Sequence, residues 1–220
     1  LCGGLFVMSQ LPAGAKPNAE KKLPDGLKDV RKITIQVGAK TPFKALHVSD
    51  SHLTWTDSRD NERKLKLGEK RLKSFPDAEY YFNESLRYAG ENGMLYLHTG
   101  DLIDFVTEAN LEYVASRLSG SVAVTAAGNH EYSQYVGEAK EDAAYKAQTY
   151  DMVQKAYPND LTFASCVING VNFVAVDDVY YNFTDHQRKL MKKEVRKGLP
   201  IVMMCHVPLY TPEHCALILK

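Results

Sequence analysis

The stretch VAVTAAGNHE, residues 122–131, joins a run of small and β-branched residues to a polar turn. The run 122–126 has the length and composition of a buried strand. Gly128 then allows a sharp turn, and Asn129 and His130 follow it directly. The stretch therefore predicts a strand that delivers an amide and an imidazole into a loop, as is typical of functional loops in α/β sheets.

Three other fragments repeat this arrangement, each placing carboxylate or imidazole donors directly after a strand-like run. Taken singly, each fragment is common by chance. Taken together and always at a strand end, they favour one shared site, because a two-metal hydrolytic centre needs oxygen and nitrogen donors from several loops. The fragments are Asp50-Ser51-His52 after Phe43–Val48, Gly100-Asp101-Leu102-Ile103-Asp104 after Met94–His98, and His206-Val207-Pro208 after Ile201–Cys205.

Short apolar runs alternate with amphipathic stretches from Ile33 onward, which predicts an α/β fold. The pair Asn169-Gly170 between two strand runs indicates a hairpin, so the sheets should be mixed and not purely parallel. We expect a four-layer α/β sandwich with mixed β-sheets flanked by helices, incomplete at its C-terminus. Further expected strands are 33–37, 163–168 and 171–176, and expected helices are 76–88, 107–118, 139–157 and 184–197.

Composition limits the possible functions. The 220 residues are 45% hydrophobic, enough for one sizeable core, so we expect a single domain over residues 33–220. Basic and acidic residues are equal in number, 27 each, and no basic run occurs, which argues against a nucleic-acid partner. Four scattered cysteines indicate neither a disulfide framework nor a structural zinc site. Nothing in the pattern indicates an oligomeric state.

The N-terminal region differs in composition from the rest. Residues 1–15 are mostly apolar and end in Ala13-Gly14-Ala15, which we interpret as the remnant of a secretory signal peptide. The apolar stretch is too short to span a bilayer. Residues 16–32 read as a linker or surface arm. The expected location is therefore outside the cytoplasm: periplasmic, extracellular or, if Cys2 is acylated, lipid-anchored.

The four fragments, in this order, resemble the motifs of the calcineurin-like metallophosphoesterase superfamily. That family's motifs are Asp-x-His, Gly-Asp-x-x-Asp, Gly-Asn-His-Glu/Asp, a single His and Gly-His-x-His, and the likeness covers about residues 43–210. It implies metal-dependent hydrolysis of a phosphate monoester or diester by a dinuclear centre, with a bridging hydroxide as nucleophile. The ligands it implies here are Asp50 and His52 for one ion, Asp101 as the bridge, and Asn129 and His206 for the second ion.

The resemblance also implies two catalytic residues that bind no metal. His130 would face the substrate, and Asp104 would orient it. As an imidazolium, His130 would stabilise developing charge and protonate the leaving group, and a carboxylate on its other nitrogen would raise its pKa. The mixed oxygen and nitrogen donors favour two divalent ions such as Mn, Fe, Zn or Co over Ca.

Other polar residues near the fragments have less specific interpretations. Glu131 is expected to cap or brace its loop, and Asp177-Asp178 to form an acidic turn outside the site. His47 and His98 are expected to be core or supporting groups.

The fifth motif, Gly-His-x-His, is absent from the chain, which ends at Lys220. We interpret the chain as an internal fragment of a phosphoesterase; the alternative is a short paralogue without catalysis. Two other functions stay open: a secreted metal- or phospholigand-binding module of the same fold, and a structural domain without bound metal. The expected substrate is a small-molecule or nucleotide-like phosphate ester, although residues 53–75 and 132–160 carry no motif that identifies it.

Overall fold

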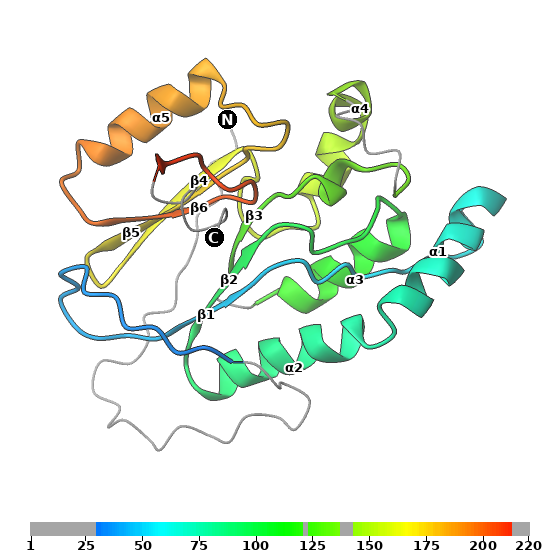
Figure 1. Ribbon diagram of the computed structural model, residues 1–220, viewed down its shortest axis with the longest axis horizontal. Helices are drawn as coiled ribbons and strands as arrows, with labels where there is room; N and C mark the ends of the chain where they lie inside the picture. The colour runs from blue at the N-terminus through cyan, green and yellow to red at the C-terminus, as the bar shows by residue number, and fades with distance from the viewer. Residues whose placement is uncertain (1–29, 121–122, 137–142, 213–220) are drawn as a thin grey trace.

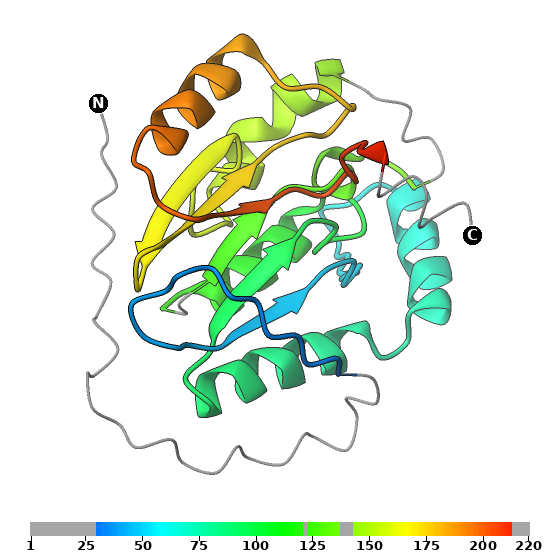
Figure 2. The same cartoon turned by 60° about the vertical axis from the view of Figure 1, so that its left-hand side comes forward.

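The computed structural model describes residues 30–120, 123–136 and 143–212. Two three-stranded sheets lie face to face, and helices cover their outer faces (Figure 1). The view in Figure 2 shows α5 above the second sheet and α2 below the first. The expected α/β sandwich is therefore confirmed. The predicted signal remnant, most of the predicted arm and the first residues of the helix expected from 139 lie outside the described residues.

The first sheet is parallel throughout, with the order β1-β2-β3. β1 spans Ala45–Val48, β2 spans Leu95–Thr99 and β3 spans Ala123–Ala126. Because the strands are parallel, their carboxyl ends meet at one edge of the sheet, and ligand-binding loops gather there. The helices that connect these strands are α1 (Glu62–Ser74), α2 (Ala78–Glu91) and α3 (Glu108–Leu118).

The second sheet is mixed, with the order β4-β5-β6. β4 (Phe163–Ile168) and β5 (Val171–Val176) form the predicted antiparallel hairpin. Asn169 and Gly170 both have positive φ, 48° and 85°, as a two-residue hairpin turn requires. β6 (Ile201–Met204) runs parallel to β5. The remaining helices are the short 3-10 turn η1 (His130–Tyr132), α4 (Ala143–Gln154) and α5 (Asp185–Val195).

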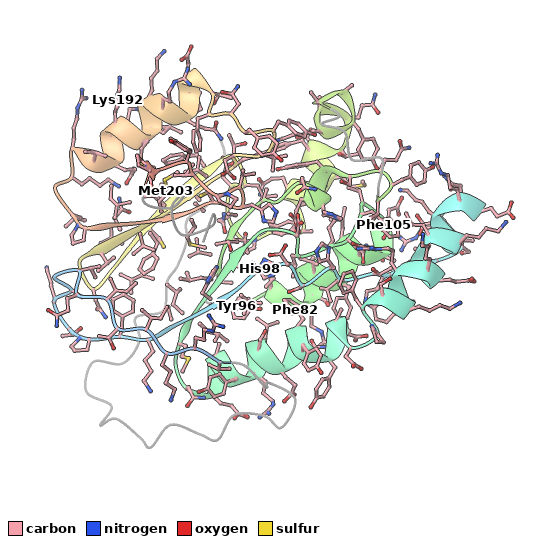
Figure 3. All side chains as sticks on the ribbon, viewed as in Figure 1. Phe82, Tyr96, His98, Phe105, Lys192 and Met203 are labelled. Atoms are coloured by element: carbon pink, nitrogen blue, oxygen red, sulfur yellow. The ribbon has the colours of Figure 1, made fainter. Side chains whose placement is uncertain are left out.

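Two apolar clusters hold these layers together. One lies between the sheets, where Leu97 and Val124 pack with Phe173 of β5. The other lies between the first sheet and its helices. There the rings of Phe82 on α2 and Tyr96 on β2 pack edge to face, with their centroids 6.4 Å apart (Figure 3). Burial of such apolar area is the main favourable term in folding. The two clusters therefore fix the sheet edge at which the polar loops emerge.

Helix ends follow local signals closely. Thr107 and Thr184 are N-caps whose hydroxyls accept the N–H of Asn110 and Gln187, at the starts of the helices predicted over 107–118 and 184–197. Gln187 completes a capping box at α5. Lys192, on the last turn of α5, points outward from the sandwich (Figure 3).

One predicted strand does not form, and one helix was not predicted. Residues 33–37 form no strand, and Ile33 and Ile35 are 80% and 69% exposed, because no neighbouring strand pairs with this segment. Conversely, the helix α1 occupies residues that carried no helical prediction. Its sequence, ERKLKLGEKRLKS, has only isolated leucines among charged residues, too few for the continuous apolar stripe that identifies other helices.

Within the described residues, the chain contains no helix with the length and apolar character that a bilayer crossing demands.

Candidate metal centre

The loops after β1 and β2 run side by side and are joined by backbone hydrogen bonds. Asp50 N–H donates to Gly100 O at 3.0 Å, and His52 N–H donates to Asp101 O at 3.0 Å. An isolated bridge then pairs Leu53 with Ile103. The parallel pairing of the strands thus continues into the loops, which places the first two sequence fragments beside each other.

Three of the predicted ligands have a backbone conformation that L-residues rarely adopt. Asp50, His52 and Asp101 have φ values of 54°, 47° and 54°. Such left-handed residues cost free energy and persist where the surrounding structure enforces them, often at functional sites. Here the paired loops enforce the conformation, which turns all three side chains toward one region.

Gly100 and Gly128 allow the loops after β2 and β3 to touch. A Cβ atom added to Gly128 would lie 2.2 Å from Asp101 Oδ1, and one added to Gly100 would lie 2.6 Å from Gly128 N. Neither glycine can therefore be replaced without moving the backbone or the Asp101 carboxylate. The two glycines therefore allow the backbones of the two loops to approach each other closely, in addition to allowing the turns.

Glu131 braces this junction from inside. Its fully buried carboxylate accepts the N–H groups of Asp101 at 2.8 Å, Leu102 at 2.7 Å and Gly128 at 2.6 Å, together with the Tyr157 hydroxyl at 2.9 Å. Burial and the Asp101 carboxylate raise the pKa of Glu131, and the N–H donors oppose that rise. The expected bracing role is confirmed, because Glu131 ties the loops after β2 and β3 together.

Asp101 lies at the centre of the site, 4% exposed and surrounded by three imidazoles. Its Oδ2 is 3.4 Å from His206 Nε2, 3.9 Å from His130 Nε2 and 4.0 Å from His52 Nε2. Burial acts to raise the pKa of Asp101, but His206 and His130 lower it below its usual value. The carboxylate is therefore ionised at neutral pH and faces ligands from three other loops.

Two groups of side chains in this site could each hold a metal ion. One consists of His52, Asp101 and His130, and the other of Asp50, Asp101 and His206; within each group the ligand atoms lie within 4.8 Å of one another. Carboxylate oxygen and imidazole nitrogen fit first-row divalent ions. Asp101 belongs to both groups, so the donors present fit a pair of ions that share this carboxylate.

Asp104 supports two of these imidazoles. Its buried carboxylate lies 3.0 Å from His52 Nδ1, and its backbone carbonyl accepts from His130 Nδ1 at 2.5 Å. Arg71 donates to both carboxylate oxygens, at 2.5 and 2.8 Å. Burial acts to raise the pKa of Asp104, yet the hydrogen bonds from these three residues hold it well below its usual value. Since both Nδ1 atoms face Asp104, both Nε2 atoms face Asp101.

His206 is oriented separately. Its Nδ1 donates to the Thr99 carbonyl at 2.8 Å, which leaves Nε2 toward Asp101. The hydrogen bond with Asp101 raises the pKa of His206 to about 9 against the opposing effect of burial. Asp178 holds the loop, because its Oδ1 accepts the N–H groups of His206 at 3.0 Å and Val207 at 3.2 Å.

The remaining predicted residues lie in the same region. Asp50 is the most open of them, with a side chain 54% exposed and Oδ1 3.9 Å from His52 Nε2. Asn129 is half-buried beside His130, and its carbonyl accepts the Ser133 hydroxyl at 3.0 Å. The fold therefore brings the four fragments together. The division of ligands between two ions and the separate role of His130 stay predictions.

Sequence reasoning did not identify two supporting residues. Arg71 lies in α1, where no motif marks it, so only the folded structure reveals its contact with Asp104. Asp178 was expected in an acidic turn outside the site, but it holds the backbone of His206. Its position directly after a strand run is the same signal that identified the other fragments, and could have found it.

The model of one protein family, described as calcineurin-like phosphoesterase, matches residues 43–219. This range includes every loop of the candidate centre. The chain therefore belongs to the calcineurin-like phosphoesterase family. No curated protein sequence matches the chain.

Proposed function

We propose that this member of the calcineurin-like phosphoesterase family hydrolyses a phosphate monoester or diester with two bound divalent ions. The observation that carries the proposal is the position of Asp101. Its buried carboxylate is shared by two groups of possible ligands, and three imidazoles face it. A carboxylate between two sets of nitrogen donors is the arrangement that a dinuclear centre needs.

In this proposal the ligands divide as the family motifs imply. Asp50 and His52 would hold one ion, Asn129 and His206 would hold the other, and Asp101 would be shared between them. Asp50 also falls in one group with His206, and its carboxylate lies 3.9 Å from His52 Nε2, so it is near both imidazoles. Mn, Fe, Zn and Co suit this donor set. When bound, such ions acidify coordinated water and stabilise negative charge on phosphoryl oxygens.

His130 supplies the proton that leaves with the alcohol. In the metal-free protein, burial acts to lower the pKa of His130, but Asp104 and Asp101 raise it above the usual imidazole value. Its Nδ1 is engaged by the Asp104 carbonyl, which leaves Nε2 to hold a proton on the Asp101 side. A proton donor fixed at this position lowers the barrier to expulsion of a basic leaving group.

A combined metal and activity measurement tests the proposal. Purified protein is analysed for Mn, Fe, Co and Zn, and assayed with p-nitrophenyl phosphate and bis-p-nitrophenyl phosphate. Asp101→Asn should lose stoichiometric metal and lower kcat more than about 100-fold. That loss exceeds the roughly 10- to 100-fold effect that is typical when a residue hydrogen-bonded to a metal ligand is changed. The matched control is Asp185→Asn, whose side chain on α5 is 83% exposed; it should retain both properties.

The outcomes separate the competing functions. Full activity of Asp101→Asn contradicts the proposal. Metal retained by the unsubstituted protein without turnover of either ester indicates a binding module, and absence of stoichiometric metal indicates a structural domain.

A further inference from the structure

The helix α1 contacts the site although it belongs to none of the four motif loops. Within α1, whose residues the structure describes in full, Gly68 alone is buried. A Cβ on Gly68 would lie 2.8 Å from the Thr56 side chain, so α1 packs closely on the segment that follows His52. Lys64 adds a hydrogen bond to the Val106 carbonyl at 2.6 Å. These contacts fix α1 beside the candidate centre with little apolar burial.

Arg71 is the residue of α1 that reaches Asp104. Its Nε donates to Asp104 Oδ2 at 2.5 Å, and its Nη2 donates to Oδ1 at 2.8 Å. The Arg71 side chain is 19% exposed and the Asp104 side chain is fully buried. A planar guanidinium that binds both oxygens fixes the plane of the carboxylate as well as its position.

Arg71 also contacts Phe75, whose ring packs against the face of the His52 imidazole. The guanidinium carbon lies 4.8 Å from the centre of the Phe75 ring. That ring stacks on His52, with centroids 5.1 Å apart and planes 9° apart. His52 is therefore held by Asp104 through its Nδ1 and by Phe75 against its face, and Arg71 contacts both of these residues.

We propose that Arg71 is a positioning residue for the metal centre: by fixing the carboxylate of Asp104, it orients the imidazole of His52 toward Asp101. Without the guanidinium, the buried carboxylate can rotate, and the His52 imidazole loses a fixed partner. The inference rests on the proposed metal-dependent function. It adds to that function a residue from α1, outside the four motifs.

The geometry distinguishes Arg71 from an ordinary surface ion pair. Arg87 on α2 also donates to carboxylates, at 2.7 Å to Glu84 and 2.9 Å to Glu91, but it lies on an exposed helix face. Exposed pairs of that kind contribute little to stability and nothing to a distant site. Arg87→Ala is therefore the matched control for Arg71→Ala.

Cobalt binding to the metal-free protein provides the test, because Co²⁺ reports its ligand geometry in its visible absorption spectrum. The full chain is stripped with a chelator and titrated with Co²⁺ by calorimetry and spectroscopy, as the unsubstituted protein, Arg71→Ala, Arg71→Lys and Arg87→Ala. Arg71→Ala should raise the dissociation constant for Co²⁺ about 10- to 100-fold, which is typical for loss of a residue that holds a metal ligand in place. It should also change the visible spectrum of the bound Co²⁺. Arg71→Lys should give a dissociation constant between those of the unsubstituted protein and Arg71→Ala, because lysine keeps the charge but cannot bind both carboxylate oxygens in the same plane.

Each result decides the matter. An Arg71→Ala protein that binds Co²⁺ with unchanged affinity and spectrum, even at a lower Tm, has lost only a structural contact, and the inference is overturned. If Arg71→Ala does not fold, Arg71→Lys decides by the same criterion. Failure of the unsubstituted protein to bind Co²⁺ instead overturns the proposed metal-dependent function itself.

Discussion

The two ends of the candidate centre are built differently. At the Asp104 end, the imidazoles face a fully buried carboxylate that is itself held by an arginine. At the His206 end, the Asp50 side chain is mostly exposed to solvent, and His206 is held through its backbone N–H and by the Thr99 carbonyl. The Asp104 end consists of His52, His130, Asp104 and Arg71, and the His206 end consists of Asp50, His206 and Asp178.

The difference shows how a site can combine rigidity with access. Side chains whose hydrogen-bond partners are already in place lose little freedom when they bind an ion. The Asp104 end has such partners on both imidazoles, whereas the Asp50 side chain is 54% exposed. The Asp104 end should therefore contribute most of the binding free energy, and the His206 end should provide the route by which ions and substrate enter.

The comparison predicts unequal losses when one ligand is removed from each end. His52→Ala should raise the dissociation constant for Mn²⁺ more than about 100-fold, above the usual range for a residue behind the ligands. Asp50→Ala should have a clearly smaller effect, because this exposed carboxylate is not held in place before binding. Isothermal titration of the metal-free proteins measures both. Equal losses would show that the bracing at the Asp104 end does not affect affinity.

A second prediction separates proton donation from metal binding at the Asp104 end. His130→Asn should retain the metal and lower kcat about 100-fold or more for an alkyl phosphate, since general acids typically contribute at least that much. The loss should be smaller for p-nitrophenyl phosphate, whose leaving group needs little protonation.

Metal analysis and kcat for the two esters test this prediction, with His186→Asn on the exposed face of α5 as the control. Parallel loss of metal and activity would make His130 a ligand, which its place in one group of possible ligands also permits.

The smallest expected effect concerns how the stability of the metal-free protein depends on pH. The two ends of the candidate centre should contribute to this dependence in opposite directions. Hydrogen bonds depress the pKa of Asp104 below its ordinary 3.8, so its contribution to stability is present above that pH and is lost as the pH falls further. Asp101 raises the pKa of His206 from 6.5 to about 9, so its contribution is complete below pH 6.5 and is lost as the pH rises through 9.

Urea denaturation of chelator-treated protein from about pH 2 to about pH 10, in steps of about one pH unit, measures both responses. Compared with the unsubstituted protein, His206→Asn should make the free energy of unfolding less dependent on pH in the alkaline range. Asp104→Asn should do the same in the acid range. An alkaline pH dependence that persists unchanged in His206→Asn would contradict the assignment.

Local patterns were sufficient to predict most of the fold. The N-caps Thr107 and Thr184, and the hairpin turn at Asn169-Gly170, act within a few residues, so their physics is visible in the chain itself. The strand predicted at 33–37 does not form, because a strand exists only when another strand pairs with it. The helix α1 was missed because polar contacts and not an apolar stripe hold it in place.

The sequence by itself determined which loops carry the donors. Asp50, Asp101, Asn129 and His206 each follow a strand run. The parallel strands of the first sheet bring the first three loops to one edge. Only the tertiary structure decided how those donors are held. Arg71 lies 33 residues before Asp104, and Asp178 lies 28 residues before His206. Contacts over such separations depend on how the layers pack.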